Sequence, residues 1–150
     1  VVFAPCPVGP RRSARCRAEA IEVDGEFRIT GRRPIAVRAG GTPLAVVASR
    51  SHNTPETDAF IRDLGAAEIV SVGSSLKFCL VAAAEADVYP RFGRTMEWDT
   101  AAGDAVLRAA GGMTRTLDGQ PLAYGKRNQA SDADFANPHF IASGKAAKAV

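Results

Sequence analysis

The chain has 150 residues, of which 46% are hydrophobic and 23% charged, with a formal net charge of +3 at pH 7. This length and composition are typical of a soluble globular protein with one core, and the mild charge gives no indication of a nucleic-acid polymer as partner. The apolar runs are much shorter than the roughly 20 residues of a membrane-spanning helix, so the sequence predicts no transmembrane segment.

The cysteine pattern indicates the redox environment. Cys6, Cys16 and Cys79 are odd in number and show no C-x-x-C spacing. This favours a reduced protein without a disulfide framework or a zinc site, so we expect a cytoplasmic location. Residues 1–10 contain prolines and no basic segment, which does not match a signal peptide. Peripheral membrane association and a homodimer stay open at this point.

Short apolar runs in the first 48 residues predict β-strands. The first is residues 1–4, which a proline ends. Residues 21–29 alternate apolar and polar side chains around Asp24-Gly25, a pattern typical of a β-hairpin with a tight turn. Residues 35–37 predict another short strand, and the continuous apolar run 44–48 predicts a central strand of a sheet.

A helix is predicted after this central strand. Thr54-Pro55-Glu56 indicates its start, with a hydroxyl cap and a proline in the first turn, and Gly65 indicates its end. We expect its buried face to consist of Ala59, Phe60 and Leu64. Residues 68–72 then predict the next strand.

Two further helices are predicted around a short strand at residues 87–89. One begins near residue 74, and its apolar positions recur at helical spacing: Leu76, Cys79, Leu80 and Ala83. The other covers residues 99–110 and ends at Gly111-Gly112, with one face formed by Ala102, Ala105, Val106 and Ala109. Residues 116–120 predict a turn, 128–137 a polar loop and 140–142 a last strand. This alternation of strands and helices indicates an α/β fold.

The side chains suited to chemistry gather in residues 73–112. Two predicted helix N-termini in this stretch carry partial positive charge and are flanked by Lys77, Arg91 and Arg94. Asp99 begins the second of these helices and is the candidate metal-binding carboxylate. Helix N-termini, basic side chains and a carboxylate are together suited to binding a phosphate and its counter-cation.

Three motifs in this stretch resemble the inositol monophosphatase superfamily. Trp98-Asp99-Thr100-Ala101-Ala102-Gly103 is similar to the Trp-Asp motif that closes the active site in that family. GSSLKF at residues 73–78 and YPRFG at residues 89–93 resemble its CysQ-type branch, which hydrolyses 3′(2′),5′-bisphosphate nucleotides in sulfate assimilation. The resemblance implies a magnesium-dependent phosphatase that removes the 3′-phosphate of adenosine 3′,5′-bisphosphate. It also implies the layered α/β/α/β fold of the sugar phosphatases.

The same resemblance implies roles for individual residues. Asp99 would ligate a Mg²⁺ ion beside the substrate and so serve catalysis. Lys77 and Arg91 would bind the second phosphate of the nucleotide, although each could also be a solvated surface cation. Three polar residues would also contact the nucleotide: His52, Ser74 and Ser75. The two serines could instead cap the helix that follows them.

Other metal-binding motifs of that family, an acidic Gly-Glu-Glu-like turn and Asp-Pro-x-Asp-Gly-Thr, do not occur in the sequence. The nearest matches are Asp24-Gly25 and Asp118-Gly119, and each lacks the second aspartate and the threonine. The chain also begins with Val1, so we expect residues 1–150 to be the C-terminal part of one phosphatase domain. The N-terminal, metal-binding half of the same protein would then be a partner, and the chain alone would be inactive.

Two other functions fit the same residues. One is a phosphatase of the same superfamily that acts on inositol or sugar phosphates, against which Lys77 and Arg91 argue. The other is a nucleotide-binding module without catalytic activity. The sequence upstream of Val1 would separate the enzyme from the binding module, because an Asp-Pro-x-Asp-Gly-Thr segment there would supply the missing metal ligands.

Overall fold

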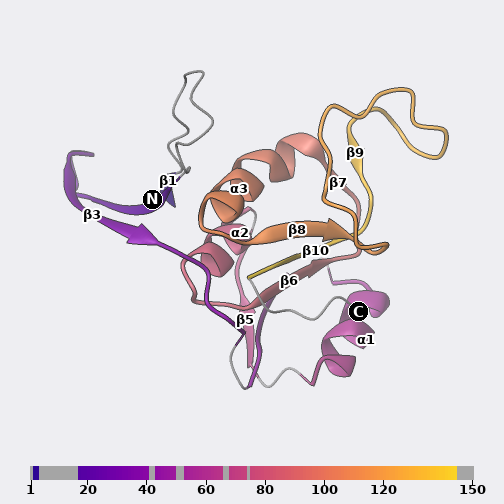
Figure 1. Cartoon of the computed structure of the whole chain (residues 1–150), viewed down its shortest axis with the longest axis horizontal. Coiled ribbons are helices and arrows are strands. Elements are labelled where there is room, and N and C mark those ends of the chain that lie inside the picture. The colour runs from indigo at the N-terminus through magenta and orange to yellow at the C-terminus, as the bar shows by residue number, and fades with distance from the viewer. Residues whose placement is uncertain are drawn as a thin grey trace.

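A computed structural model describes residues 2–3, 17–40, 43–49, 53–65, 68–73 and 75–144 of the chain. Two of the predicted substrate contacts, His52 and Ser74, lie outside these ranges. Within them the fold is mixed α/β, as the alternation of predicted elements indicates, with one five-stranded sheet, one three-stranded sheet and one two-stranded pair (Figure 1).

The five-stranded sheet forms the centre of the described structure. Its strands are β4 (Ala45–Ala48), β5 (Glu68–Ser71), β6 (Val88–Arg91), β8 (Met113–Thr116) and β10 (Phe140–Ser143). Their spatial order is β5-β4-β6-β10-β8. β4 runs parallel to β5 and β6, whereas β10 is antiparallel to β6 and β8. Every residue of β4 is buried, which confirms the central strand predicted from its continuous apolar run.

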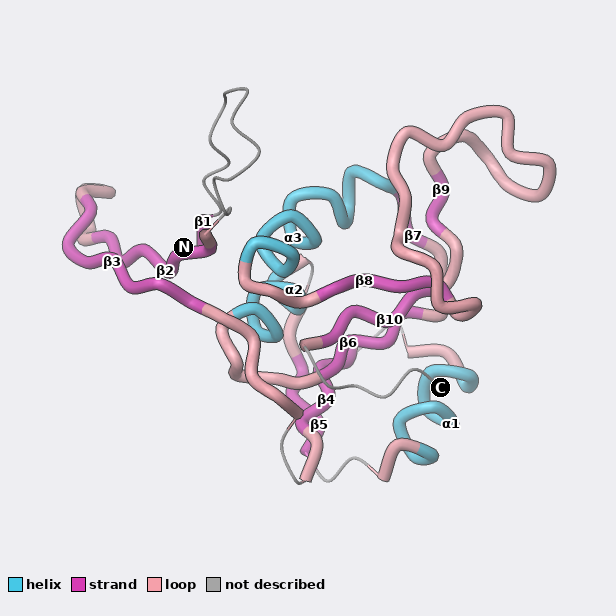
Figure 2. Tube along the Cα trace, in the orientation of Figure 1, coloured by secondary structure: helices cyan, strands magenta, loops and turns pink. Residues whose placement is uncertain are grey.

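Helices cover both faces of this sheet (Figure 2). On one face, α1 (Pro55–Asp63) packs its Ile61 against Val46 and Ala48 of β4. The predicted cap is confirmed, because the Thr57 amide donates to Thr54 Oγ1 at 3.3 Å. The predicted buried face is only partly right: Thr57 and Ile61 are buried, whereas Ala59, Phe60 and Leu64 are half-buried.

On the other face lie α2 (Leu76–Ala82) and α3 (Glu97–Ala109). The predicted apolar face of α2 is only partly right: Cys79, Leu80 and Ala83 are half-buried against the core, whereas Leu76 is exposed. The fully buried residues of the helix are Lys77, Phe78, Val81 and Ala82. Similarly, the predicted face of α3 is partly right: Val106 is buried and Ala109 half-buried, whereas Ala102 and Ala105 are exposed. Gly103 and Leu107 are buried as well. Each helix contacts both the sheet and the other helix, so its buried face is wider and rotated relative to a single apolar stripe.

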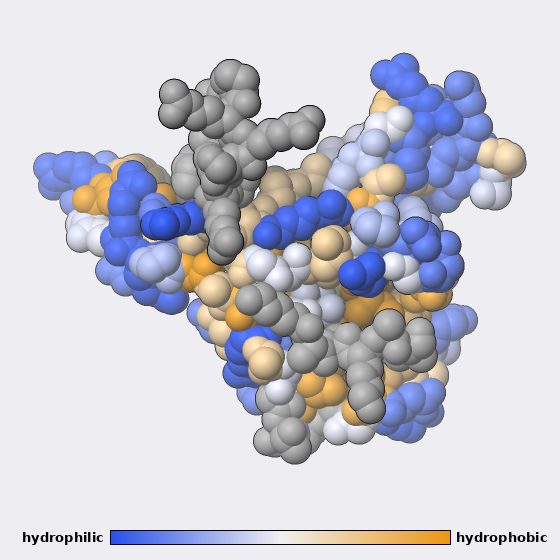
Figure 3. All heavy atoms as spheres, in the orientation of Figure 1, coloured by the Kyte–Doolittle hydropathy of each residue, from blue (hydrophilic) through white to orange (hydrophobic). Residues whose placement is uncertain are grey.

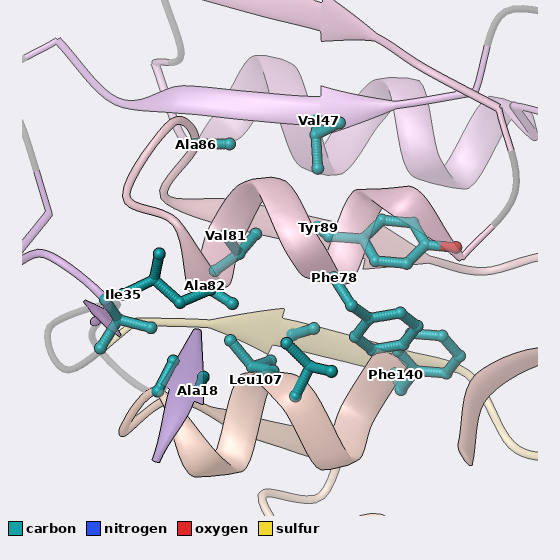
Figure 4. Packing of buried hydrophobic residues seen from close by; sticks show 14 of the residues in the cluster. Ala18, Ile35, Val47, Phe78, Val81, Ala82, Ala86, Tyr89, Leu107 and Phe140 are labelled. Atoms are coloured by element: carbon teal, nitrogen blue, oxygen red, sulfur yellow. The ribbon is translucent and has the colours of Figure 1, made fainter. Parts of the chain in front are cut away.

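The contact between α2 and α3 depends on a glycine. A Cβ atom added to Gly103 would lie 2.6 Å from Cδ2 of Phe78, closer than two carbon atoms can pack. The Phe78 ring lies beside Tyr89 of β6 and Phe140 of β10, with ring centroids 5.2 and 5.8 Å away (Figure 4). These three rings join the helices to the middle of the sheet.

The three-stranded sheet consists of β1 (Val2–Phe3), β2 (Ala18–Val23) and β3 (Ile29–Ile35). Its β2–β3 hairpin confirms the hairpin predicted around Asp24-Gly25 and projects to the left of the main sheet in Figure 1. The separate strand predicted at residues 35–37 is wrong, because β3 ends at Ile35 and the Val37 amide donates to the carbonyl of Ala110 instead.

A partly buried ion pair holds the segment between the two sheets. Both guanidinium nitrogens Nε and Nη2 of Arg38 donate to the Asp87 carboxylate, at 2.7 and 2.8 Å. The Ala45 amide at the start of β4 donates to the same carboxylate at 2.8 Å. Asp87 therefore links the connection after β3 to the beginnings of β4 and β6.

The remaining strands form a short pair, β7 (Thr95–Met96) with β9 (Ala136–Asn137). The loop between β8 and β9 carries the predicted turn, in which Gly119 has a φ of +82°. Figure 3 shows hydrophilic side chains over this loop, at the upper right of the view. In the described ranges, no helix has the length and apolar character needed to cross a membrane.

Candidate functional site

Three of the predicted site residues lie on different elements that converge at one end of β6. Lys77 is in the first turn of α2, Arg91 is the last residue of β6, and Asp99 is in the first turn of α3. Tyr89 of β6 senses the charges of two of them. Burial raises the pKa of its phenol, the Arg91 charge lowers this pKa and the Asp99 charge raises it. Lys77, Tyr89, Arg91 and Asp99 therefore form one electrostatic cluster.

Lys77 is 3% exposed, so the alternative of a solvated surface cation is wrong for this residue. Its ammonium nitrogen lies 5.3 Å from the centroid of the Tyr89 ring, a cation–π geometry. Burial lowers the pKa of Lys77, and the nearby charge of Arg91 lowers it further. The protein thus holds a positive charge below its surface, close to a second one.

Arg91 carries a hydrogen-bond donor that the described residues do not satisfy. One terminal nitrogen, Nη2, donates to the Arg94 carbonyl at 3.4 Å. Its Nε is buried and has no acceptor within the described part of the chain. Leaving a buried donor without an acceptor costs about 1–3 kcal/mol, and an anion bound to the guanidinium would remove that cost.

Asp99 is the third residue of α3, because the helix begins at Glu97 rather than at Asp99 as the sequence predicts. Its Oδ2 accepts a hydrogen bond of 2.8 Å from the Met96 amide and so caps the helix. The residue is nevertheless exposed, and its other carboxylate oxygen faces no donor among the described residues. The cap and a ligand role are therefore compatible in one side chain.

The described residues provide only part of a magnesium site. They contain no cluster of three or more His, Cys, Asp or Glu side chains that could hold a metal ion. Asp104 and Glu97, the nearest acids on α3, are engaged by Arg108 and Lys126. Mg²⁺ prefers hard oxygen ligands, so the exposed oxygen of Asp99 fits one position of its coordination shell. Further ligands would have to come from outside the described residues.

The N-terminus of α2 contributes less to the predicted phosphate site than the sequence indicates. The helix has seven residues, and Ser75 occupies its N-cap position without a side-chain capping hydrogen bond. The predicted capping role of Ser75 is therefore wrong, and its predicted contact with substrate stays a prediction. α3 is the longer of the two helices, with 13 residues, and the Asp99 carboxylate in its first turn accepts from the amide of the N-cap residue Met96.

A polar network that no sequence pattern indicates lies against the start of α3. The Glu97 carboxylate accepts hydrogen bonds from the amides of Gly125 and Lys126, at 2.7 and 3.0 Å, and from Lys126 Nζ at 2.6 Å. Burial raises the pKa of Glu97, but these hydrogen bonds outweigh it and lower the pKa to about 2. Lys126 is 29 residues from Glu97 in a polar loop, so no local pattern connects them.

A model of the inositol monophosphatase family matches residues 13–148 of the chain. An uncharacterized protein in the pss 5′ region of Rhizobium leguminosarum bv. phaseoli is 67% identical over 85 residues, 57% of this chain and 90% of that protein. The 3′(2′),5′-bisphosphate nucleotidase CysQ of Escherichia coli K12 is 47% identical over 112 residues, 75% of this chain and 43% of that protein.

Solved structures share the fold. CysQ from Bacteroides thetaiotaomicron, a bacterial member of the inositol monophosphatase family, matches with a TM-score of 0.67 and 38% identity. That match covers 89% of this chain and 51% of the other. Inositol monophosphatase II from Staphylococcus aureus matches with a TM-score of 0.58 at 14% identity, which shows the fold alone. The chain thus spans about half the length of the CysQ proteins that it matches.

Proposed function

The chain belongs to the inositol monophosphatase family, and from this membership we propose that it forms part of a phosphatase acting on bisphosphate nucleotides. The proposed reaction is hydrolysis of the 3′-phosphate of adenosine 3′,5′-bisphosphate, in the cytoplasm and in the service of sulfate assimilation. Two relatives named CysQ, at 47% and 38% identity, support this substrate class over inositol or sugar phosphates.

One observation carries the choice of substrate, namely that the buried Nε of Arg91 has no acceptor among the residues that the structure describes. This donor lies on the guanidinium whose charge lowers the pKa of the buried Lys77, so the two cations share one region. A phosphate oxygen would supply the acceptor that Arg91 lacks, and the two positive charges would offset a doubly charged group. A substrate with a single phosphate, held by metal ions, needs no such second anion site.

The residues of this chain would hold and orient the substrate. Asp99 would bind one Mg²⁺ through the oxygen that does not cap α3, and the remaining ligands would come from other parts of the protein. Bound Mg²⁺ ions polarise phosphoryl oxygens and help to generate a hydroxide nucleophile. Arg91 would bind the non-reacting phosphate through its guanidinium, and Lys77 would act on it as a point charge. The further substrate contacts that we propose are His52, Ser74 and Ser75.

The test is steady-state kinetics of the full-length protein with two substrates, adenosine 3′,5′-bisphosphate and inositol 1-phosphate. Arg91→Gln removes the charge, and a charge-assisted hydrogen bond contributes roughly 1.5–3 kcal/mol. We therefore expect kcat/KM for the bisphosphate to fall about tenfold to a hundredfold, with little change for inositol 1-phosphate. Lys77→Met should act in the same direction, since it removes the charge and keeps the length of the side chain.

Arg94→Gln is the matched control. Arg94 is exposed and pairs with Asp132 at 3.0 Å, and only its backbone carbonyl contacts Arg91. In this variant kcat/KM should stay near the wild-type value for both substrates. Equal losses on both substrates in Arg91→Gln would refute the second-phosphate role. Preferred turnover of inositol 1-phosphate would favour the other phosphatase class, and nucleotide binding without turnover would favour a binding module.

A further inference from the structure

The loop between β8 and β9 packs against the first turn of α3 and is hydrogen-bonded to it. Glu97 is 8% exposed, and its carboxylate accepts three hydrogen bonds from Gly125 and Lys126. The Glu97 amide in turn donates to the carbonyl of Phe135 at 2.9 Å. Both the side chain and the backbone of Glu97 are therefore fixed, two residues before Asp99 in the sequence.

The Lys126 ammonium group uses all three of its donors. It donates to Glu97 Oε1 at 2.6 Å, to the Ala123 carbonyl at 2.7 Å and to Asn137 Oδ1 at 3.2 Å. With its acceptors in place, the ammonium sets the position of the Asn137 amide. The loop, β9 and the start of α3 are thus joined through one half-buried cation.

Asn137 extends the network to both sides of Asp99. Its Nδ2 donates to Thr95 Oγ1 at 3.2 Å and to Thr100 Oγ1 at 3.1 Å. The segment that carries Asp99 is therefore tied down at residues 95, 97 and 100. Asp99 itself is exposed and has one hydrogen bond in the described structure, from the Met96 amide, so its position depends on this backbone.

We infer that Glu97, Lys126 and Asn137, here called the anchoring network, are positioning residues that hold the Asp99 carboxylate in place for a metal ion. A catalytic group has to be held within about 0.5 Å of its working position by the side chains behind it. A fully satisfied polar network gives such a fixed geometry, whereas a merely stable contact could be made by apolar side chains. The inference rests on the proposed function, because it assigns a ligand role to Asp99.

The test measures Mg²⁺ binding to the full-length protein by isothermal titration calorimetry, without substrate. Loss of a group that orients a metal ligand typically weakens metal binding by about tenfold to a hundredfold, and this is the result expected for Lys126→Met. Steady-state kinetics should show a lower kcat with an unchanged KM for adenosine 3′,5′-bisphosphate, since Lys77 and Arg91 lie outside the network. Lys126→Arg keeps the charge and should restore part of the Mg²⁺ affinity and part of kcat.

Arg115→Met is the matched control, because Arg115 is an exposed cation near the same loop and donates to the Gly119 carbonyl. Its Mg²⁺ affinity should equal that of the wild type. If Lys126→Met fails to fold, Asn137→Ser, which leaves the Glu97–Lys126 pair intact, takes its place with the same expectation. Wild-type Mg²⁺ affinity in a folded network variant would overturn the inference and leave the proposed function standing. A wild-type protein that binds no Mg²⁺ would overturn both.

Discussion

The ammonium group of Lys77 lies 5.3 Å from the centre of the Tyr89 ring, and both side chains are buried. Removing a charged amine from water costs free energy, of which a cation–π contact offsets about 0.5–2 kcal/mol. A protein that keeps such a charge beneath its surface sacrifices stability at that position. The arrangement is consistent with a role for Lys77 in binding an anion.

The first prediction concerns this cost. The pKa of Lys77 is lowered from 10.5 by burial, so the folded protein binds this proton less tightly than the unfolded chain does. The penalty is fully present at pH values below the folded-state pKa and fades as the pH rises toward 10.5. Lys77→Met removes this group, so the free energy of unfolding at neutral pH should rise relative to that of the wild type. The advantage should shrink at alkaline pH.

Urea unfolding of the full-length protein at neutral and alkaline pH checks this prediction. Lys126→Met is the contrasting variant, because the Lys126 ammonium lies 2.6 Å from the Glu97 carboxylate and its loss should lower stability. An advantage of Lys77→Met that does not change with pH would show that packing, rather than the buried charge, causes it.

The second prediction separates the two roles of Asp99. Asp99→Asn keeps an oxygen that can accept from the Met96 amide, whereas Asp99→Ala removes the cap. Loss of the cap should cost about 1 kcal/mol of stability, so only the alanine variant should melt at a lower temperature. Both variants should lose turnover in the full-length protein, since neither keeps the charged ligand. Asp132→Asn, at an exposed ion pair with Arg94, is the control. Strong turnover by Asp99→Asn would exclude a metal-ligand role.

The third prediction concerns the contact between α2 and α3. Gly103→Ala would place a Cβ atom 2.6 Å from Phe78, whose ring is enclosed by Tyr89 and Phe140 and cannot move away freely. Overpacking of this kind typically costs about 1–3 kcal/mol. Gly25→Ala is the matched control, because no atom lies within 4 Å of its added Cβ. Thermal unfolding should show a lower melting temperature for Gly103→Ala alone. Equal effects at the two positions would contradict the packing argument.

The fourth prediction concerns the link between the two sheets. Arg38→Met removes both guanidinium hydrogen bonds to Asp87, which is 4% exposed. Breaking a buried ion pair costs about 3–5 kcal/mol, and the lower end applies because the Arg38 side chain is partly exposed. Arg33→Met, at an exposed pair with Glu85 at a distance of 4.0 Å, should change stability by less than about 1 kcal/mol. Chemical denaturation of both variants gives the comparison, in which equal losses would contradict the prediction.

Local signals in the sequence identified most elements correctly. Thr54, Pro55 and Gly65 marked the ends of α1, and the continuous apolar run at residues 44–48 marked the buried strand β4. These signals are local, because capping, backbone conformation and burial on both faces each act within a few residues. The buried faces of α2 and α3 were predicted only in part, since their exact positions depend on a helix–helix contact that a glycine permits.

The candidate site was only partly predictable for a related reason. Residue type and motif selected Lys77, Arg91 and Asp99, and their elements do converge in space. Sequence could not show that Lys77 is buried, because burial of a charge depends on the surrounding tertiary structure. The sequence did not predict the anchoring network, since Glu97 and Lys126 are 29 residues apart and no sequence motif includes both.

The place of β10 in the sheet has a consequence for biosynthesis. β10 follows every other described strand in the sequence, yet it lies between β6 and β8 and pairs with both. While the ribosome is still making residues 117–139, β8 has no neighbour in this sheet to which it can bond. The sheet can therefore close only after residues 140–143 have emerged, so the nascent chain exposes unpaired strand edges until then. Chaperones that shield such edges would then be needed most at this stage.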